Sequence, residues 1–300
     1  MTHLVHVNGE LVPATEASVS VRDRGFLYGD GVFETLRVYG GTPFEWDRHL
    51  ARMRRSLDHV GMAVSLEELE LRKRVDATLQ ANGWADAYVR VSLTRGVQPG
   101  RLTPEEVVDP TVVVLAEPLP RGGITGERVW ADPATCTIAT TQRIPSAAIP
   151  AAAKTHNYLN GILARLEART RARDEAIMLD AEGHLTEGAT SNLFFVDDGR
   201  LHTPTVTALP VLPGITREVV IELAEGRGVS VLEGTWSESD LARADEAFLT
   251  NSTWEVRPID RIDEHSYTVG SVTTTLTEAF DERIERTCYD RSSANNTSGQ

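Results

Sequence analysis

The sequence predicts an α+β fold of two domains, in which strands and helices mix without strict alternation. Short apolar or alternating runs bounded by Gly, Pro and Asn indicate strands along the whole chain, and apolar residues at three- and four-residue steps indicate several helices. Only some of the predicted strands are followed by a helix. Because parallel neighbours are usually joined through a helix, a purely parallel sheet is not expected. The chain has 300 residues, 41% of them hydrophobic, which is enough apolar material for one large domain or two smaller ones.

Residues 1–118 contain the elements of a small N-terminal α+β domain. An Asn-Gly pair at position 8, inside an alternating run, is a strong hairpin signal. Apolar residues between Leu50 and Val60 recur at helical spacing, and Ser65, followed three residues later by Glu68, has the pattern of a helix start. The predicted elements are a hairpin over residues 3–13, strands over 31–39, 87–96 and 111–120, and helices over 46–62 and 65–82.

A Pro- and Gly-rich stretch over residues 119–127 is typical of a linker between domains. Residues 128–291 are expected to form a larger C-terminal domain, and the polar tail over 292–300 is expected to be disordered. The strands predicted in this half are 129–133, 137–143, 176–180, 192–198, 200–204 and 246–252, and the helices are 157–173 and 215–228.

The charge of the chain excludes some classes of partner. Its 44 acidic and 30 basic residues give a net charge of -14, and such a surface repels nucleic acid and anionic lipid. No apolar run is long enough to span a membrane and no secretory signal is recognisable, so a cytoplasmic protein is expected. Cys136 and Cys288 lie far apart, which predicts neither a disulfide framework nor a metal site. Lys73 and Lys154 are the only lysines, and with the acidic excess this suggests adaptation to high salt, although a high-GC genome would give the same bias toward arginine.

Lys154 is the first candidate for a catalytic role. It lies among small and apolar residues just before a predicted helix. A partly desolvated amine has a lowered pKa and forms an imine with an aldehyde, which a solvated surface lysine does poorly. The alternative is an ordinary lysine whose stem covers apolar surface while its ammonium stays in water. Lys73, in the charged stretch ELRKRVD, fits that alternative.

Other candidates suit a ring nitrogen or an anion. Glu187, between two predicted strands, could pair with a protonated heterocycle, although a solvated turn is the simpler interpretation. The helix start at residues 214–216 and the turn at 250–253 offer amides and hydroxyls to a phosphate, but would equally be a capped helix and a polar turn. Most arginines in a run such as HLARMRRSL form a solvated face, but Arg52 turned inward beneath Leu50 and Met53 could grip a phosphate with two nitrogens.

Seven stretches between Tyr28 and Ile259 occur in one order and mark a region of roughly residues 3 to 270. They are YGDGVFETLR, HLARM, YVRVSLTRG, KTHNYLNGILARLEA, DEAIMLDAEGHLTEGATSNLFFVDDGRLHTP, LPGITREVV and DEAFLTNSTWEVRPI. Together they resemble the class IV pyridoxal-phosphate enzymes: branched-chain aminotransferases, D-amino-acid aminotransferases and 4-amino-4-deoxychorismate lyases. The lysine followed by Asn-aromatic-Leu, the TEG..SNLF stretch and the GITR helix start are jointly specific.

The resemblance implies a fold type IV enzyme with a small N-terminal α/β domain and a larger C-terminal pseudo-barrel domain. Its cofactor would be pyridoxal 5'-phosphate, with Lys154 as Schiff-base lysine and proton shuttle and Glu187 paired with the pyridine nitrogen. Members act on small amino substrates and usually form homodimers. The residues that would hold the phosphate are Arg52, the amides of Ile215 and Thr216, and Ser252.

Two reactions of this family remain open. FETLR at 33–37 and Thr-Asn-Ser at 250–252 depart from the branched-chain pattern and favour the lyase, which releases pyruvate and 4-aminobenzoate from aminodeoxychorismate. In that interpretation Thr35 passes a proton, while Arg101 and Asn251 hold carboxylates.

The YVRV stretch instead favours an aminotransferase that acts on branched-chain or D-amino acids and 2-oxo acids, with Tyr88 and Arg90 on the substrate carboxylate. Phe33 and Thr253 complete the expected substrate contacts. A non-catalytic pyridoxal-phosphate-binding protein is the least expected alternative, because Lys154 is present together with its glutamate.

Overall fold

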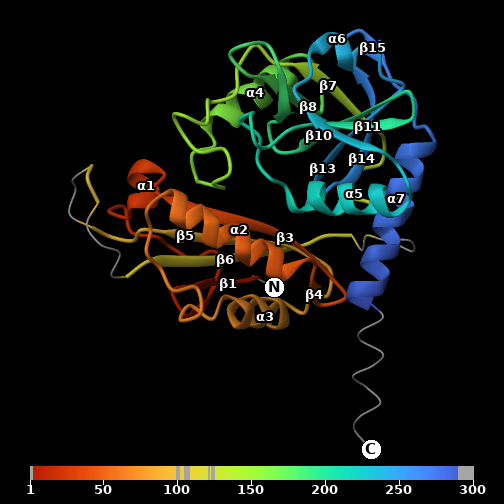
Figure 1. Ribbon diagram of the computed structural model, residues 1–300. Helices are drawn as coiled ribbons and strands as arrows, with labels where there is room; N and C mark the ends of the chain where they lie inside the picture. The colour runs from red at the N-terminus through yellow and green to blue at the C-terminus, as the bar shows by residue number, and fades with distance from the viewer. Residues whose placement is uncertain (1–2, 99–101, 105–108, 121, 123–125, 290–300) are drawn as a thin grey trace, which may run out of the picture. The chain divides into compact units, whose positions relative to one another are not determined.

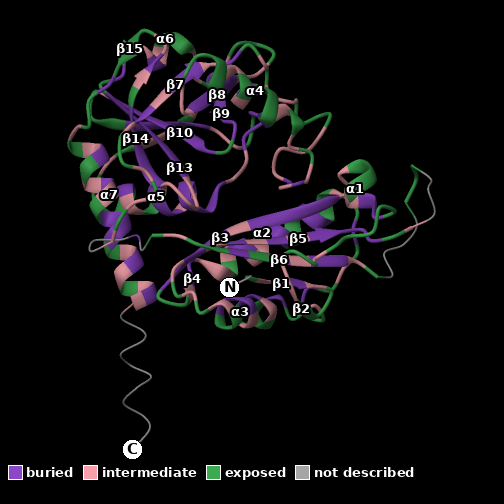
Figure 2. Ribbon diagram, turned by 180° about the vertical axis from the view of Figure 1, so that it is seen from behind, coloured by how far each residue is buried: buried purple, intermediate pink, exposed green. Residues whose placement is uncertain are grey.

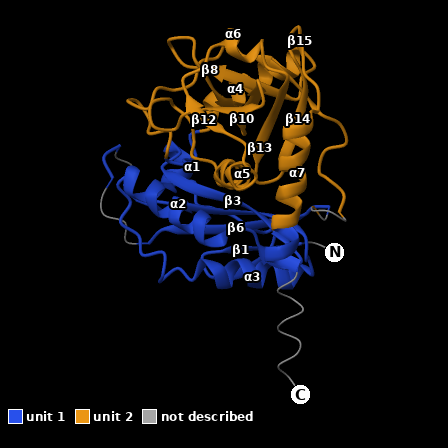
Figure 3. Cartoon of the chain, turned by 45° about the vertical axis from the view of Figure 1, so that its right-hand side comes forward, with its two compact units in different colours: residues 1–121, 153–157, 284–300 blue, residues 122–152, 158–283 orange. Residues whose placement is uncertain are grey.

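The computed structural model (Figure 1) describes residues 3–98, 102–104, 109–120, 122 and 126–289. The chain divides into two compact units, coloured separately in Figure 3. The first unit consists of residues 1–121, 153–157 and 284–300, and the second of residues 122–152 and 158–283. The expected domains were continuous in sequence, whereas these units are not. Arg101 and the tail over 292–300 lie outside the described residues.

The first unit is built on a six-stranded antiparallel sheet with strand order β2-β1-β6-β5-β3-β4. The hairpin predicted at its start is confirmed, because Asn8 and Gly9 both take positive φ, as its tight turn requires. Its elements are β1 Leu4–Val7, β2 Glu10–Pro13, α1 Arg24–Tyr28, β3 Gly31–Tyr39, β4 Thr42–Pro43, α2 Trp46–His59, α3 Leu71–Asn82, β5 Ala87–Thr94 and β6 Thr111–Pro118.

Helices α2 and α3 share one hydrophobic core with alternate residues of β3, β5 and β6. On β3 these residues include Val32, Leu36 and Val38, so the residues between them point to the other face of the sheet. Figure 2 shows most of β3 and β5 as buried. The alternation therefore sorts β3 into a helix-covered face and a second face that carries Phe33 and Thr35.

The second unit contains a closed ring of strands. Within its nine-stranded sheet, β10, β13, β14, β7, β8 and β9 pair in sequence, and β9 pairs back with β10. This closure confirms the expected pseudo-barrel in an α+β fold. The elements of the unit are β7 Ala134–Ile138, α4 Leu159–Thr170, β8 Glu175–Leu179, β9 Leu185–Gly188, β10 Asn192–Asp197, β11 Arg200–Pro204, α5 Ile215–Gly226, β12 Val231–Gly234, α6 Glu238–Leu241, β13 Glu246–Asn251, β14 Glu255–Ile262, β15 His265–Ser266 and α7 Ser271–Ile284.

Two segments belong to the first unit although the residues that precede them belong to the second. Residues 153–157 lie along the edge of β3, where Val32 and Thr155 form a bridge. At the C-terminal end, a π-helix over Glu285–Tyr289 follows α7, and its Tyr289 hydroxyl donates to the Asp86 carboxylate at 2.6 Å. Contacts across long sequence separations therefore place both segments in the first unit.

Several predicted elements were wrong in extent. The helix expected from Ser65 begins only at Leu71, because residues 66–70 form turns and Glu70 takes a positive φ of 45° before the first helical residue. No strand forms over 129–133, where Pro133 has no N–H to donate to a ladder. The strand expected over 137–143 ends at Ile138. Elements that the sequence did not predict are α1, β4, β9, β12, α6, β14, β15, α7 and the π-helix.

Among the described residues, no helix combines the length and the apolar character that crossing a membrane would require.

Candidate active-site residues

The main chain of Lys154 is fixed to the edge of β3. The Phe33 N–H donates to the Lys154 carbonyl at 2.9 Å, and the His156 N–H donates to the Gly31 carbonyl at 2.9 Å. The Lys154 N–H donates to the Ser56 hydroxyl of α2 at 3.0 Å. Residues 154–156 thus act as a short added strand, which sets the direction in which the lysine leaves the backbone.

The Phe33 ring contacts two cationic groups of the predicted site. The Lys154 Nζ is 4.5 Å from the ring centroid, and the guanidinium carbon of Arg90 is 3.5 Å from it. Thr35 is the register partner of Arg90 on β5, and Tyr88 lies two residues before Arg90 on the same strand. The second face of this sheet therefore brings together five of the residues that the sequence singled out, with cation–π contacts at its centre.

Arg52 points inward, as expected, but its guanidinium is paired with a carboxylate. Its Nε and Nη2 donate to the two oxygens of Glu34 at 2.8 Å and 2.7 Å, so the two-nitrogen grip expected for a phosphate is made here to Glu34. His49 adds a contact from Nδ1 to Glu34 at 2.7 Å. All three side chains are buried. Glu34 and His49 were not predicted from the sequence. An acidic residue on the apolar side of a strand was the signal that could have revealed Glu34.

The charges of this cluster control its protonation. Burial would raise the pKa of Glu34, but Arg52 and then His49 outweigh it, so the pKa of Glu34 lies well below its usual range. Burial lowers the pKa of His49, and the nearby charges of Arg52 and Lys154 lower it further against the opposing effect of Glu34. The cluster therefore holds an ionised carboxylate under the segment that carries Lys154.

His156, two residues after Lys154, gives a prediction for pH. Burial, followed by the charge of Arg90, lowers its pKa from 6.5 to about 4, and its Nε2 finds no partner among the described residues. The unfolded chain binds this proton more readily than the folded one, so stability is expected to fall as pH drops from 6.5 toward 4, by about 3 kcal/mol for this group. Urea unfolding at several pH values would measure the loss, and His156→Gln should flatten that slope. An NMR titration with an ordinary midpoint near 6.5 would contradict the prediction.

Glu187 is not a solvated turn residue. It lies on β9 and is 5% exposed. Its carboxylate pairs with Arg143 Nη2 at 2.6 Å and accepts from the Asn192 side-chain amide at 3.1 Å and the Leu212 N–H at 3.0 Å. Arg143 and Asn192 were not predicted as site residues; only Asn192, inside the SNLF motif, lay in a recognised stretch. These contacts hold the carboxylate in one orientation.

Helix α5 begins where the sequence predicted a helix start, at residues 214–216. Ile215 and Thr216 are its first residues and are buried, and the preceding Gly214 has no side chain with which to cap the helix. A Cβ built on Gly214 would lie 2.0 Å from the Asn192 side-chain oxygen, so only glycine allows Asn192 to pack here. The same asparagine therefore contacts both Glu187 and the helix start.

The turn after β13 is held by Asn251 itself. Its side-chain oxygen accepts from the Thr253 N–H at 3.0 Å and the Trp254 N–H at 2.7 Å, and its amide donates to the Thr190 carbonyl at 3.3 Å. An asparagine that organises its own turn needs no substrate to explain its presence. This weakens the lyase argument, which used Asn251 as a carboxylate ligand.

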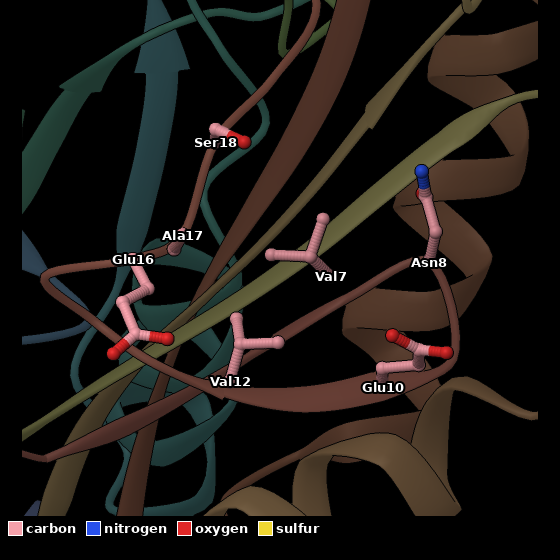
Figure 4. Close-up of a pocket in the computed structure, with 7 residues that line it drawn as sticks. All are labelled: Val7, Asn8, Glu10, Val12, Glu16, Ala17 and Ser18. Carbon is pink, nitrogen blue, oxygen red and sulfur yellow. The ribbon is translucent and has the colours of Figure 1, made fainter.

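A pocket beside the N-terminal hairpin contains none of the predicted site residues. Figure 4 shows its lining, which carries two carboxylates and no basic side chain. A phosphate or a carboxylate substrate finds no matching charge there. The lining residues are Val7, Asn8, Glu10, Val12, Glu16, Ala17 and Ser18.

These features define a class of protein: a two-unit α+β enzyme with a fixed lysine on one sheet and a buried carboxylate on a closed barrel. The chain belongs to the class IV aminotransferase family, whose model, described as Amino-transferase class IV, matches residues 31–262. The family depends on pyridoxal phosphate, so the chain is a pyridoxal-phosphate-dependent enzyme, either a transaminase or a lyase.

Three similar proteins illustrate the range of the family. A protein of Methanocaldococcus jannaschii with the provisional name branched-chain-amino-acid aminotransferase is 38% identical over 279 residues, covering 92% of this chain and 94% of its own. The branched-chain aminotransferase of the thermophilic archaeon Thermoproteus uzoniensis, solved with norvaline, has a TM-score of 0.86 at 33% identity, covering 96% of both chains. The 4-amino-4-deoxychorismate lyase of Pseudomonas aeruginosa has a TM-score of 0.80 at 32% identity, covering 95% of this chain and 99% of its own.

These comparisons support the aminotransferase alternative better than the lyase that the FETLR and Thr-Asn-Ser patterns favoured. The departures from the branched-chain pattern are short, and one of them, at Asn251, has a structural explanation in its own turn.

Proposed function

We propose that the chain is an aminotransferase that moves an amino group between a branched-chain or D-amino acid and a 2-oxo acid. The observation that carries the proposal is the pair of cations on the Phe33 ring, Lys154 at 4.5 Å and Arg90 at 3.5 Å. A transaminase must hold a carboxylate near its catalytic amine for amino and oxo acids in turn, and a guanidinium suits that carboxylate. The branched-chain aminotransferases among its relatives support this assignment.

The residues present fit pyridoxal 5'-phosphate. When bound, this cofactor supplies an aldehyde that captures amines and a ring that withdraws electrons. Lys154 would hold the aldehyde and move the substrate proton, and the carboxylate of Glu187 would hold the ring nitrogen. The uncapped amides of Ile215 and Thr216 suit the phosphate.

Two further residues are assigned to the phosphate. Ser252 follows Asn251 in the turn after β13, and we assign its hydroxyl to a phosphate oxygen. We assign Arg52 as a nearby positive charge rather than a two-nitrogen ligand, because its Nε and Nη2 donate to Glu34.

We assign the substrate to the second face of the β3–β5 pair. Arg90 and Tyr88 would bind the carboxylate, Phe33 would contact the apolar part, and Thr35 would hold a proton or a water beside the amine. Thr253 and Arg101 remain expected substrate contacts.

The lyase is the second candidate, and Thr35 is the observation that favours it, because a hydroxyl beside Arg90 could deliver a proton to a departing carbon. The test has two parts. The purified enzyme is mixed with single amino acids, without an oxo acid, while the cofactor spectrum is recorded. It is then mixed with aminodeoxychorismate alone while released pyruvate is measured. A transaminase converts the cofactor to its amine form with branched-chain or D-amino acids, and gives no pyruvate from aminodeoxychorismate. Release of pyruvate and 4-aminobenzoate without spectral conversion would overturn the proposal.

We also propose a homodimer, with helix α4 in the interface. One face of α4 packs against β8 of the same unit through Ala164 and Ala168. The opposite face exposes four large apolar side chains at helical spacing, which is unusual for a surface in water. They are Leu159 at 67%, Ile162 at 52%, Leu163 at 47% and Leu166 at 48% exposure.

Leu163→Glu is expected to weaken the dimer about a hundredfold, because a carboxylate would be buried in an apolar contact. Sedimentation equilibrium over a range of protein concentrations measures the change. Val269→Glu, at a residue that is 50% exposed and outside α4, is the control and should leave the dimer intact. An unchanged assembly in the α4 variant would place the interface elsewhere.

A further inference from the structure

Ser56 joins the catalytic lysine segment to helix α2. Its side chain is fully buried, and its hydroxyl does two things at once. The oxygen accepts the Lys154 N–H at 3.0 Å, and the hydroxyl hydrogen is donated to the Arg52 carbonyl one turn earlier at 2.9 Å. A single hydroxyl thus connects the backbone of Lys154 to the helical turn that carries Arg52.

We propose that Ser56 is a positioning residue for Lys154: it sets the backbone from which the catalytic amine extends, and it ties that backbone to the turn bearing Arg52. The proposal rests on the proposed function of Lys154 and adds a residue of α2 that has no part in binding or reaction.

One hydroxyl is sufficient to complete the hydrogen bonding of the Lys154 backbone. On the β3 side, the carbonyl of Lys154 and the N–H of His156 are already bonded to β3. The N–H of Lys154 is bonded to the Ser56 hydroxyl of α2 instead. Without the hydroxyl, a half-buried N–H loses its acceptor, which costs more than the net value of an ordinary hydrogen bond. The lysine backbone would then be held from one side only.

Arg52 gives the connection its chemical meaning. The same residue that accepts from Ser56 through its carbonyl pairs through its guanidinium with Glu34. Glu34 lies on β3 next to Phe33, whose N–H bonds Lys154. The path Lys154, Ser56, Arg52, Glu34 and back through β3 is a closed loop of hydrogen bonds and covalent chain, so we expect its members to hold one another in place.

The chain offers a matched control in the same unit. Thr78 of α3 is also fully buried, and its hydroxyl also donates to the carbonyl one turn earlier, that of Arg74, at 2.7 Å. The acceptor of the Lys154 N–H is Ser56, so a change at Thr78 leaves that bond in place. Ser56→Ala and Thr78→Val therefore remove the same kind of helical hydroxyl bond, and only the first removes the acceptor of Lys154. Ser56→Thr restores a hydroxyl and serves as the rescue variant.

Hydrogen exchange of the peptide containing Lys154, followed by mass spectrometry with and without added pyridoxal phosphate, is the first readout. We expect Ser56→Ala to speed exchange there about tenfold, and Thr78→Val to leave it unchanged. Equal exchange in wild type and Ser56→Ala, or equal acceleration in Ser56→Ala and Thr78→Val, would overturn the proposal.

Cofactor release is the second readout. From Ser56→Ala we expect release about tenfold faster than from wild type, with a changed pH midpoint of the cofactor absorbance and an amino-donor KM within about twofold. Ser56→Thr should return both the release rate and the pH midpoint of the absorbance toward wild type. If wild type itself binds no cofactor, the proposed function fails, while the exchange comparison still decides whether Ser56 holds the Lys154 backbone.

Discussion

Replacing Lys154 with alanine is expected to lower transamination by about 10⁴-fold or more, because both the covalent hold on the cofactor and the proton transfer beside it are lost. The amine is set at 4.5 Å from the Phe33 ring, and its backbone is bonded on both sides. Amino-group exchange between two amino and oxo acids measures the loss, and borohydride reduction followed by peptide mass analysis locates the cofactor.

The chain supplies a clean control, since Lys73 is its only other lysine. Lys73 forms a surface ion pair with Glu70, and its side chain is 76% exposed. Lys73→Ala should keep full activity and full labelling at Lys154. Lys154→Arg tests the charge separately: it keeps a cation near the Phe33 ring but cannot form an imine. Normal activity in the arginine variant, or cofactor reduced onto Lys73, would refute the assignment.

Local chemistry in the sequence was enough to predict the hairpin, the α2 helix and the start of α5. Each depends on neighbours a few positions apart: the Asn8–Gly9 turn, the apolar spacing of α2, and Gly214 before a helical run. The start of α3 was wrong because Ser65 does accept the Glu68 N–H, at 3.4 Å, yet this bond closes a turn instead of a helix. A capping pattern gives a local bond and does not decide how the chain continues.

Long-range pairing could not be predicted in the same way. Strand β14 carries a proline and several charged residues, so its pattern is poor, and its position depends on β13 and the parallel neighbour β7. Residues 153–157 were expected to belong with the second domain, since nothing in their sequence reveals that β3, more than a hundred residues earlier, bonds them. Such bonds exist only once the sheet has formed.

The residues of the candidate site fall into the same two groups: those that local sequence reveals and those that depend on distant parts of the chain. Lys154, Glu187, Thr216 and Arg90 could be selected because they stand in stretches that resemble a family. The groups that orient them come from distant positions: Arg143 holds Glu187, and Ser56 holds Lys154. A lone arginine or a helical serine has no pattern of its own, so only the folded geometry reveals it. The sequence therefore names the reacting groups more readily than the groups that position them.

Glu34→Gln is expected to destabilise the first unit by about 3 to 5 kcal/mol. The amide keeps the size of the carboxylate but removes the Glu34 charge that balances the guanidinium of Arg52, a residue that is 3% exposed. His49 also loses the partner that opposes its desolvation. Glu70→Gln, at an exposed ion pair with Lys73, is the matched control.

The dependence on pH separates this charge effect from simple repacking. The folded pKa of Glu34 lies below its usual 4.5, so its contribution is complete above that value and is lost as the pH falls toward the folded pKa. The wild type should therefore lose stability through this acidic range, and Glu34→Gln should lose less. Urea unfolding of both proteins at matched pH values tests this. If the two curves remain parallel, the stability of this unit does not depend on the ionised Glu34–Arg52 pair. The ion pair would then not hold Arg52 in place, and our account of Lys154 and Ser56 requires that it does.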